Sequence, residues 1–344
     1  MKLRMKILFA FIIVWTCLFP SLAEACTIFT AHKDGVTLAG NNEDWMYSSR
    51  TSVAITAPSG DGYGWVGFCI SGYLQGGMNE QGLFYDGAIC PQSEATPDPD
   101  KPTLSSINLG EKVLSQCSSV DEVVEMAKGY NLSQSSAFHL LFADASGNSA
   151  VLEWVEGEFH AIKGEGNYQA VTNFWLSKPD LGNYPCTRYK NAEEQLAKGL
   201  YSVGSFRDIL KLTAQDWGNG GTLYSNVYDL TNRVVYIYDR GKFESSARVE
   251  LVKQIKEMKP GEKTNMAISE LSFSSTGDVS PVTKTPASPA TVFYPAPRRT
   301  SPTDASPETG ISEARIIGVA AGIITAVFIL WRIFKKLKIR KKIT

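Results

Sequence analysis

The sequence predicts an α+β fold in which antiparallel sheets are stacked and covered by helices. Short strand patterns predominate between Cys26 and about residue 258, and the helical patterns fall in groups between them. With 43% hydrophobic and 11% aromatic residues, the chain has the composition of a globular enzyme. Its formal net charge of −1 produces no global field that favours nucleic acid, so no nucleic-acid partner is expected.

Each element is predicted from a local pattern. Short apolar or alternating runs next to glycine or polar turns predict strands over residues 27–31, 36–39, 66–70, 138–143, 150–155, 224–230 and 234–238. Apolar residues at helical spacing predict helices over residues 104–117, 120–128, 187–197 and 206–214. The turn sequence over residues 231–233 joins the last two strands into a hairpin.

The first 25 residues have the pattern of a cleavable signal peptide. A basic start precedes an apolar run over residues 7–19, and Ala23-Glu24-Ala25 forms an A-x-A cleavage site. Cleavage after Ala25 makes Cys26 the first residue of the mature protein. Such a residue holds both a thiol and a free α-amine, whose pKa is about 7.7–8.0 in model peptides. Its own amine can therefore activate the thiol without a histidine partner.

The other end of the chain predicts a membrane anchor. Half of the 16 prolines lie between residues 260 and 307, which predicts an extended linker over residues 263–313. A transmembrane helix is predicted over residues 314–334, close to the roughly 20 residues that cross a bilayer. The basic tail over residues 335–344 then marks the cytoplasmic side. A buried core helix is the alternative, which the position behind a linker disfavours.

These boundaries leave one exported domain on the extracytoplasmic side of the cell membrane. It is expected to run from residue 26 to residue 262. Residues 266–273 alternate between apolar and polar side chains, so the domain extends to residue 275 if they form a last strand.

The cysteine count fits a domain with a free thiol. Cys17 leaves with the signal, and the five that remain do not make a disulfide scaffold in a chain of this size. One free thiol plus four buried or paired cysteines fits the odd number, with three pairings open among Cys69, Cys90, Cys117 and Cys186. Three histidines without C-x-x-C or H-x-x-x-H spacing argue against zinc. No metal or organic cofactor is expected.

The segment after Cys26 folds back towards it. A strand from Cys26 reaches the turn Lys33-Asp34-Gly35, and the return brings residues 41–45 close to its start. Asp44 is therefore expected beside the Cys26 α-amine, where a carboxylate orients the amine and tunes its basicity. Taken alone, Asp44 also fits a turn or cap residue.

A set of motifs follows in order along residues 26–240. They are Cys26-Thr27, Lys33-Asp34-Gly35, Gly40-Asn41-Asn42-Glu43-Asp44, Gly77-Met78-Asn79-Glu80-Gln81-Gly82-Leu83, Val171-Thr172-Asn173 and Cys186-Thr187-Arg188-Tyr189. With the hairpin, this ordered set resembles the choloylglycine hydrolases and penicillin V acylases. These are linear amide C–N hydrolases of the N-terminal nucleophile class.

The resemblance implies an αββα four-layer sandwich of two antiparallel sheets between helical layers. It also implies four site residues. Cys26 matches the nucleophile, and Asp44 matches the carboxylate near its α-amine. Asn173 matches an amide that holds the site and stabilises the oxyanion. Arg188 matches an arginine that supports the thiolate and the charged intermediate.

Two positions depart from the family pattern. Asn41 stands where the family has an arginine, which removes one positive charge near the thiol. Ile89 stands where the family has an oxyanion-side asparagine or tyrosine, although a backbone N–H can serve there. Both changes weaken a claim of bile-salt or penicillin V cleavage more than they weaken the reaction type.

The function predicted is that of an exported, membrane-tethered amidohydrolase. It would cleave the linear, non-peptide amide of a small N-acyl substrate through a thioester on Cys26. An acyltransferase of the same fold is an alternative, since an amine acceptor can resolve the thioester. A binding lipoprotein with lipid on Cys26 is another, although Ala23 and Glu24 are unusual in such a site and the membrane span makes a lipid redundant. The oligomeric state is left open.

Overall fold

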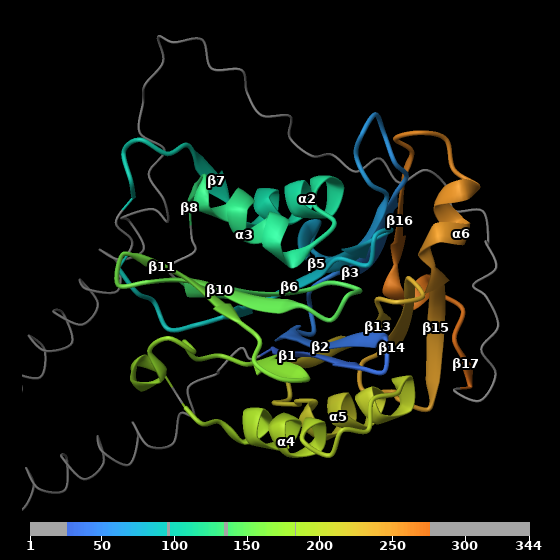
Figure 1. Ribbon diagram of the computed structural model, residues 1–344. Coiled ribbons are helices and arrows are strands. Elements are labelled where there is room, and N and C mark those ends of the chain that lie inside the picture. The colour runs from blue at the N-terminus through green and yellow to red at the C-terminus, as the bar shows by residue number, and fades with distance from the viewer. Residues whose placement is uncertain (1–25, 95–96, 134–136, 183, 276–344) are drawn as a thin grey trace, which may run out of the picture. The chain divides into compact units, whose positions relative to one another are not determined.

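A computed structural model describes residues 26–94, 97–133, 137–182 and 184–275. Its centre is a pair of antiparallel sheets (Figure 1). The first contains, in order, β12 (Tyr168–Val171), β1 (Thr27–Lys33), β2 (Val36–Met46), β13 (Gly220–Asp229), β14 (Val234–Asp239), β15 (Ser245–Glu250) and β17 (Ser274–Ser275). β1 lies between β2, which follows it directly in the chain, and β12, which comes from a distant part of the chain.

The second sheet is antiparallel throughout its described pairs. It contains, in order, β11 (Glu158–Lys163), β10 (Ser149–Val155), β9 (Phe138–Ala143), β6 (Phe84–Ile89), β5 (Tyr73–Asn79), β4 (Trp65–Ile70), β3 (Thr51–Thr56) and β16 (Lys263–Ala267). A separate small ladder pairs β7 (Thr103–Ser105) with β8 (Asn131–Ser133) in parallel.

Helices cover the outer face of each sheet (Figure 1). The described helices are α2 (Ser106–Gln116), α3 (Val120–Lys128), α4 (Thr187–Leu196), α5 (Val203–Thr213) and α6 (Leu251–Lys256), with short 3₁₀ turns η2 (Pro179–Leu181) and η3 (Ile268–Glu270). Helices α2 and α3 pack on the second sheet, and α4 and α5 pack on the first. Two antiparallel sheets covered by helices is the architecture that the strand and helix patterns predicted.

The apolar core forms separate layers because successive side chains of a strand face opposite ways. In β1, Ile28 belongs to the cluster between the sheets, whereas Phe29 belongs to the cluster beneath α4 and α5. Gly40 on β2 leaves room for the Phe29 ring, since a Cβ there would lie 2.6 Å from it. The inner cluster also includes Cys26, which places the predicted nucleophile between the two sheets.

Strand β2 is longer than its sequence predicts. The strand was expected over residues 36–39, but it continues to Met46 through four polar residues that are all buried. These residues lie in the middle of the sheet, where β2 pairs with β1 on one side and with β13 on the other. Tertiary pairing therefore extends the strand beyond its apolar part. The predicted turn before it is present, with Asp34 and Gly35 at φ of 52° and 77°.

Residues 263–275 lie within the folded unit. Strand β16 pairs with β3, and β17 pairs with β15. Of the two domain ends considered from the sequence, the one at residue 275 includes these strands. No helix within the described ranges is long and apolar enough to cross a bilayer. The predicted signal peptide (1–25), the rest of the linker, the transmembrane helix (314–334) and the basic tail lie outside the described residues.

Candidate active site

Cys26 lies immediately before β1 and keeps 6% of its surface exposed. Its thiol donates to Glu43 Oε1 at 3.8 Å. Burial raises the pKa of the Cys26 thiol well above its usual value, and the charges of Glu43 and Asp44 add to the rise. A backbone hydrogen bond from Asp44 acts in the opposite direction. The thiol is therefore protonated at neutral pH, and nucleophilic attack requires a base that removes its proton.

Arg188 connects three of the predicted residues. Its Nη1 donates to the backbone oxygen of Cys26 at 2.5 Å and to Thr27 Oγ1 at 3.0 Å. Its Nη2 donates to Asn173 Oδ1 at 2.9 Å. The guanidinium thus holds the main chain at the nucleophile rather than the thiol itself.

Helix α4 carries Arg188 in its first turn because Cys186 is the N-cap residue of the helix. The Cys186 Sγ accepts from the backbone N–H of Tyr189 at 3.4 Å, which caps the helix. The same sulfur lies 3.2 Å from Thr172 Oγ1, next to Asn173 in the chain. The Cys186 sulfur therefore links the two predicted motifs, one around Asn173 and one around Arg188.

Asn173 is fixed at both ends of its amide group. Its Oδ1 accepts from Arg188, and its Nδ2 donates to the backbone oxygen of Ile89 at 2.7 Å. The Ile89 N–H is a second donor candidate, since Cys90 N–H bonds to the oxygen of Ala137, just before β9, and alternate N–H groups point opposite ways. Asn173 and Ile89 therefore bring amide groups together at the end of β6.

Asp44 is buried on β2, on the same face as Asn42, which donates to the Leu210 carbonyl of α5. Its Oδ1 accepts from Thr222 Oγ1 at 2.5 Å. Burial raises the Asp44 pKa to about 7, while the Thr222 hydrogen bond and the Arg188 charge limit the rise. Asp44 thus changes charge near neutral pH. The orientation of the α-amine by Asp44 stays a prediction.

Glu43 and Asp86 are site residues that the sequence analysis did not identify. Glu43 is 3% exposed and Asp86 1% exposed, and Asn41 Nδ2 donates to both carboxyl groups. Burial and the Asp86 charge raise the Glu43 pKa well above its usual value, and burial raises that of Asp86 to about 7. Strand alternation places Asn41 and Glu43 on the Cys26 face, a signal that was present in the sequence.

Other polar candidates have structural roles. Asn79 accepts from the N–H groups of Gln81 and Leu83. His139 Nδ1 lies 3.1 Å from Glu153 Oε1, and both side chains are fully buried. The five described cysteines are free; four of them, Cys26, Cys69, Cys90 and Cys117, are buried, and Cys186 is partly buried. Within the described residues, no three His, Cys, Asp or Glu side chains are grouped to hold a metal.

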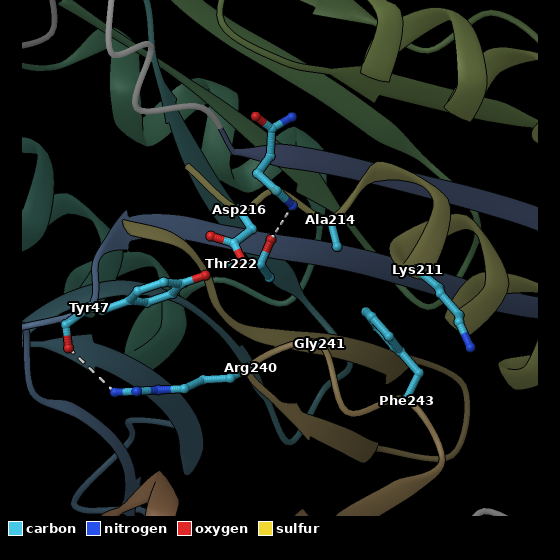
Figure 2. A pocket seen from close by; sticks show the side chains of 9 residues that line it. Tyr47, Lys211, Ala214, Asp216, Thr222, Arg240, Gly241 and Phe243 are labelled. Carbon is cyan, nitrogen blue, oxygen red and sulfur yellow. Dashed lines mark hydrogen bonds between the residues drawn. The ribbon is translucent and has the colours of Figure 1, made fainter. Parts of the chain in front are cut away.

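A cavity of about 270 Å³, whose wall includes Gln215, lies next to Thr222 (Figure 2). Thr222, the partner of Asp44, is part of its wall, and the Thr222 Oγ1 also accepts from the Gln215 N–H at 2.9 Å. The guanidinium of Arg240 lies 5.5 Å from the centroid of the Tyr47 ring in the same wall. The lining is completed by Lys211, Ala214, Asp216, Gly241 and Phe243. The hydroxyl that sets the Asp44 pKa therefore lines this cavity.

Comparison with known proteins identifies the class of enzyme. The model of the linear amide C–N hydrolases, choloylglycine hydrolase family, matches residues 26–208. The chain belongs to this family and is a hydrolase that acts on the C–N bonds of linear amides. The match begins at Cys26, the residue behind the predicted cleavage site.

Solved structures share the fold at low sequence identity. Penicillin V acylase from Agrobacterium tumefaciens is 18% identical, with a TM-score of 0.57 over 70% of this chain and 90% of that chain. A variant of conjugated bile acid hydrolase from Clostridium perfringens is 17% identical, with a TM-score of 0.56 over 70% of this chain and 97% of that chain. No curated protein matches the sequence. At these identities, the likeness supports the fold and not a substrate.

Proposed function

We propose that this protein is an exported, membrane-tethered amidohydrolase whose mature N-terminal Cys26 cleaves the amide of a small N-acyl substrate. One observation carries the proposal. Arg188 binds both the backbone of Cys26 and the side chain of Asn173, and Cys26 directly follows an A-x-A site. The nucleophile, the electrostatic donors and the point of maturation thus converge on one residue.

The proposed reaction has two steps. The free α-amine of Cys26 takes the thiol proton, and the thiolate attacks the amide carbonyl. The amine then gives that proton to the leaving nitrogen, which breaks the C–N bond and leaves a thioester. Water, deprotonated by the same amine, hydrolyses the thioester and restores the thiol. Donors at Asn173 and Ile89 are positioned near the developing oxyanion, and one such donor contributes about 2.7–4 kcal/mol.

The location is inferred from the ends of the sequence. The signal pattern before Cys26, the proline-rich linker and the apolar run before a basic tail support an extracytoplasmic catalytic domain tied to the cell membrane. For the fold, the apolar clusters on the outer face of each sheet support the αββα sandwich of N-terminal nucleophile hydrolases.

Mass spectrometry of the purified protein tests maturation, and amine release from a panel of N-acyl amides tests activity. We expect an N-terminus at Cys26 and no activity in the Cys26→Ala variant. Active protein with an intact Ala25–Cys26 bond would rule the mechanism out. Acyl transfer to added amines in excess of hydrolysis would favour the transferase, and a diacylglyceryl adduct on Cys26 would favour the lipoprotein.

A further inference from the structure

We propose that Glu43 and Asp86 bind a cationic ammonium group of the substrate, so that the preferred amides carry an ammonium a few bonds from the scissile carbonyl. This inference rests on the proposed function, because it takes Cys26 as the nucleophile. Four observations on the inner faces of the two sheets carry it: the carboxyl pair, its charge, the unpaired acceptors around it and its distance from the thiol.

The two carboxyl groups come from different sheets and meet at Asn41. Glu43 lies on β2 and Asp86 on β6, and the Nδ2 of Asn41 donates to Glu43 Oε2 at 3.5 Å and to Asp86 Oδ2. The backbone N–H of Gly87 holds the other Asp86 oxygen at 2.7 Å. Gly76 leaves room for this carboxyl group, since a Cβ there would lie 2.3 Å from Asp86 Oδ2. The pair is therefore built into the facing strands.

The pair lacks a lysine, arginine or histidine partner among the described residues. Neither Glu43 nor Asp86 forms an ion pair within 4.0 Å with any lysine, arginine or histidine in the described ranges. Arg188, which lies near Cys26, contacts its backbone instead. Two buried carboxyl groups without a cation are costly to ionise, and their pKa values are raised accordingly. A cation between them would relieve that cost.

Buried acceptors around the pair also lack donors. Asn41 Oδ1, Asn226 Oδ1 and the Tyr224 hydroxyl are buried and have no hydrogen-bond partner. Across β2 and β13, Asn226 is opposite Asn41 and Tyr224 lies at the register position of Glu43. Burial raises the pKa of Tyr224 well above its usual value, and the charges of Glu43 and Asp86 add to the rise. An ammonium supplies three donors and no acceptor, which complements this set.

The pair lies within reach of a reacting substrate. Glu43 Oε1 is 3.8 Å from the Cys26 sulfur, and a carbonyl poised for attack lies about 3–3.5 Å from its nucleophile. An ammonium a few bonds from that carbonyl can therefore reach Glu43. The charge also reverses the family pattern, because Asn41 stands where the resemblance has an arginine. A site with two acids in place of a cation selects a substrate of opposite charge.

Three matched anilides test the inference on the mature protein. Glycyl-, acetyl- and succinyl-p-nitroanilide present a cation, a neutral group and an anion near the same kind of amide. We expect kcat/KM to be at least tenfold higher for the glycyl than for the acetyl compound, and lowest for the succinyl compound. In Glu43→Gln and Asp86→Asn, the glycyl-to-acetyl ratio should fall at least tenfold. Asp216→Asn, an acid in the separate cavity, should preserve the ratio.

The ratio separates substrate recognition from a general effect on the thiol. Equal loss of activity towards the glycyl and acetyl compounds in Glu43→Gln would overturn the inference, since the pair would then serve Cys26 itself. If no anilide is cleaved, the proposed function fails for this substrate set. Calorimetry of Cys26→Ala with glycinamide and acetamide then decides the inference separately. Tighter binding of glycinamide that Glu43→Gln abolishes supports the site, and equal binding of the two amides refutes it.

Discussion

Arg188 shows how one side chain organises the site at the residue scale. Its two terminal nitrogens bind three groups from two segments, namely the Cys26 carbonyl and the adjacent Thr27 hydroxyl, and the Asn173 amide oxygen. A planar fork can hold these acceptors at fixed positions, whereas a lysine ammonium is a single point charge on a flexible stem. Its main role in the structure is thus to position the nucleophile and the amide of Asn173.

Replacing Arg188 should therefore lower catalytic activity more than it lowers the stability of the fold. We expect Arg188→Lys to lower kcat/KM roughly tenfold and Arg188→Ala about 100-fold, since a small misplacement of a nucleophile has effects of this size. Steady-state kinetics on an N-acyl amide that the protein cleaves measures both. Arg207→Lys, on the exposed side of α5 beside Asp208, is the matched control and should keep full activity. Near-normal kcat/KM in Arg188→Ala would show that the guanidinium group is not needed for activity.

The Thr222 hydroxyl should set the acid limb of the pH profile. It donates to Asp44 Oδ1 and thereby stabilises the ionised carboxylate, whose pKa is about 7 with this bond in place. Thr222→Val removes the donor, so the Asp44 pKa should rise and the acid limb of kcat/KM should move to higher pH. Activity at pH 7 should fall several-fold.

Thr222→Ser keeps the hydroxyl and is the control for this change. Its acid limb should stay close to that of the unchanged protein, and activity at pH 9 should recover in Thr222→Val. An acid limb that does not move in Thr222→Val would mean that Asp44 ionisation does not control the reaction. The pH–rate profile thus tests the predicted role of Asp44 without removing its carboxyl group.

At the scale of elements, Asn79 joins a turn to a helix. It is fully buried, and its Oδ1 accepts from the N–H groups of Gln81 and Leu83 in the turn between β5 and β6. Its Nδ2 donates to the backbone oxygens of Leu114 and Cys117 at the end of α2. The turn and the helix are therefore fixed by one side chain.

Asn79→Ala should destabilise the protein by about 3 kcal/mol. The change leaves buried backbone donors and acceptors without partners, each worth about 1–3 kcal/mol, although water can replace some of them. Urea unfolding followed by circular dichroism measures the loss. Asn79→Asp keeps the acceptor for the turn and loses the donor to α2, so it should fall between Asn79→Ala and the unchanged protein. A loss below 0.5 kcal/mol in Asn79→Ala would contradict this role.

Predictability from sequence differs between elements for physical reasons. The helix over residues 120–128 and the strand over residues 138–143 are present at the predicted bounds, because their apolar patterns are local. Strand β6 was not predicted, since Asp86 and Gly87 interrupt its pattern. Asp86 is tolerated only because Gly76 on the next strand leaves space and Asn41 from the other sheet donates to it.

The candidate site was likewise only partly predictable from the sequence. Cys26, Asn173 and Arg188 could be proposed from ordered motifs, and the structure brings these three together. The contact between Glu43 and the Cys26 thiol could not be predicted in this way. It depends on the pairing of β2 with β1 and on the continuation of β2 into its polar segment. Local periodicity finds the elements, while buried polar pairs arise from contacts between distant ones.

At the scale of the whole molecule, the acids buried in and beside the central layer should make stability depend on pH. Burial raises the pKa values of Asp44 and Asp86 from 3.8 to about 7. Between about pH 4.5 and 7, the folded protein therefore keeps protons that the unfolded chain has lost. The folded state binds more protons in this window, so the free energy of unfolding falls as pH rises through it, by an amount on the order of a few kcal/mol.

Urea unfolding at pH 4.5, 5.5, 6.5 and 7.5 measures this slope. Asp86→Asn removes one of the titrating groups and also the charge that raises the Glu43 pKa, so the free energy of unfolding should fall less steeply with pH in this variant. Asp216→Asn should keep the slope of the unchanged protein. Because most proteins lose stability as carboxylates become protonated, a stability that rises from pH 4.5 to 7 would show that these acids are ionised in the folded state. For Glu43 and Asp86 to be ionised while buried, a cation would have to neutralise the pair already in the unliganded protein.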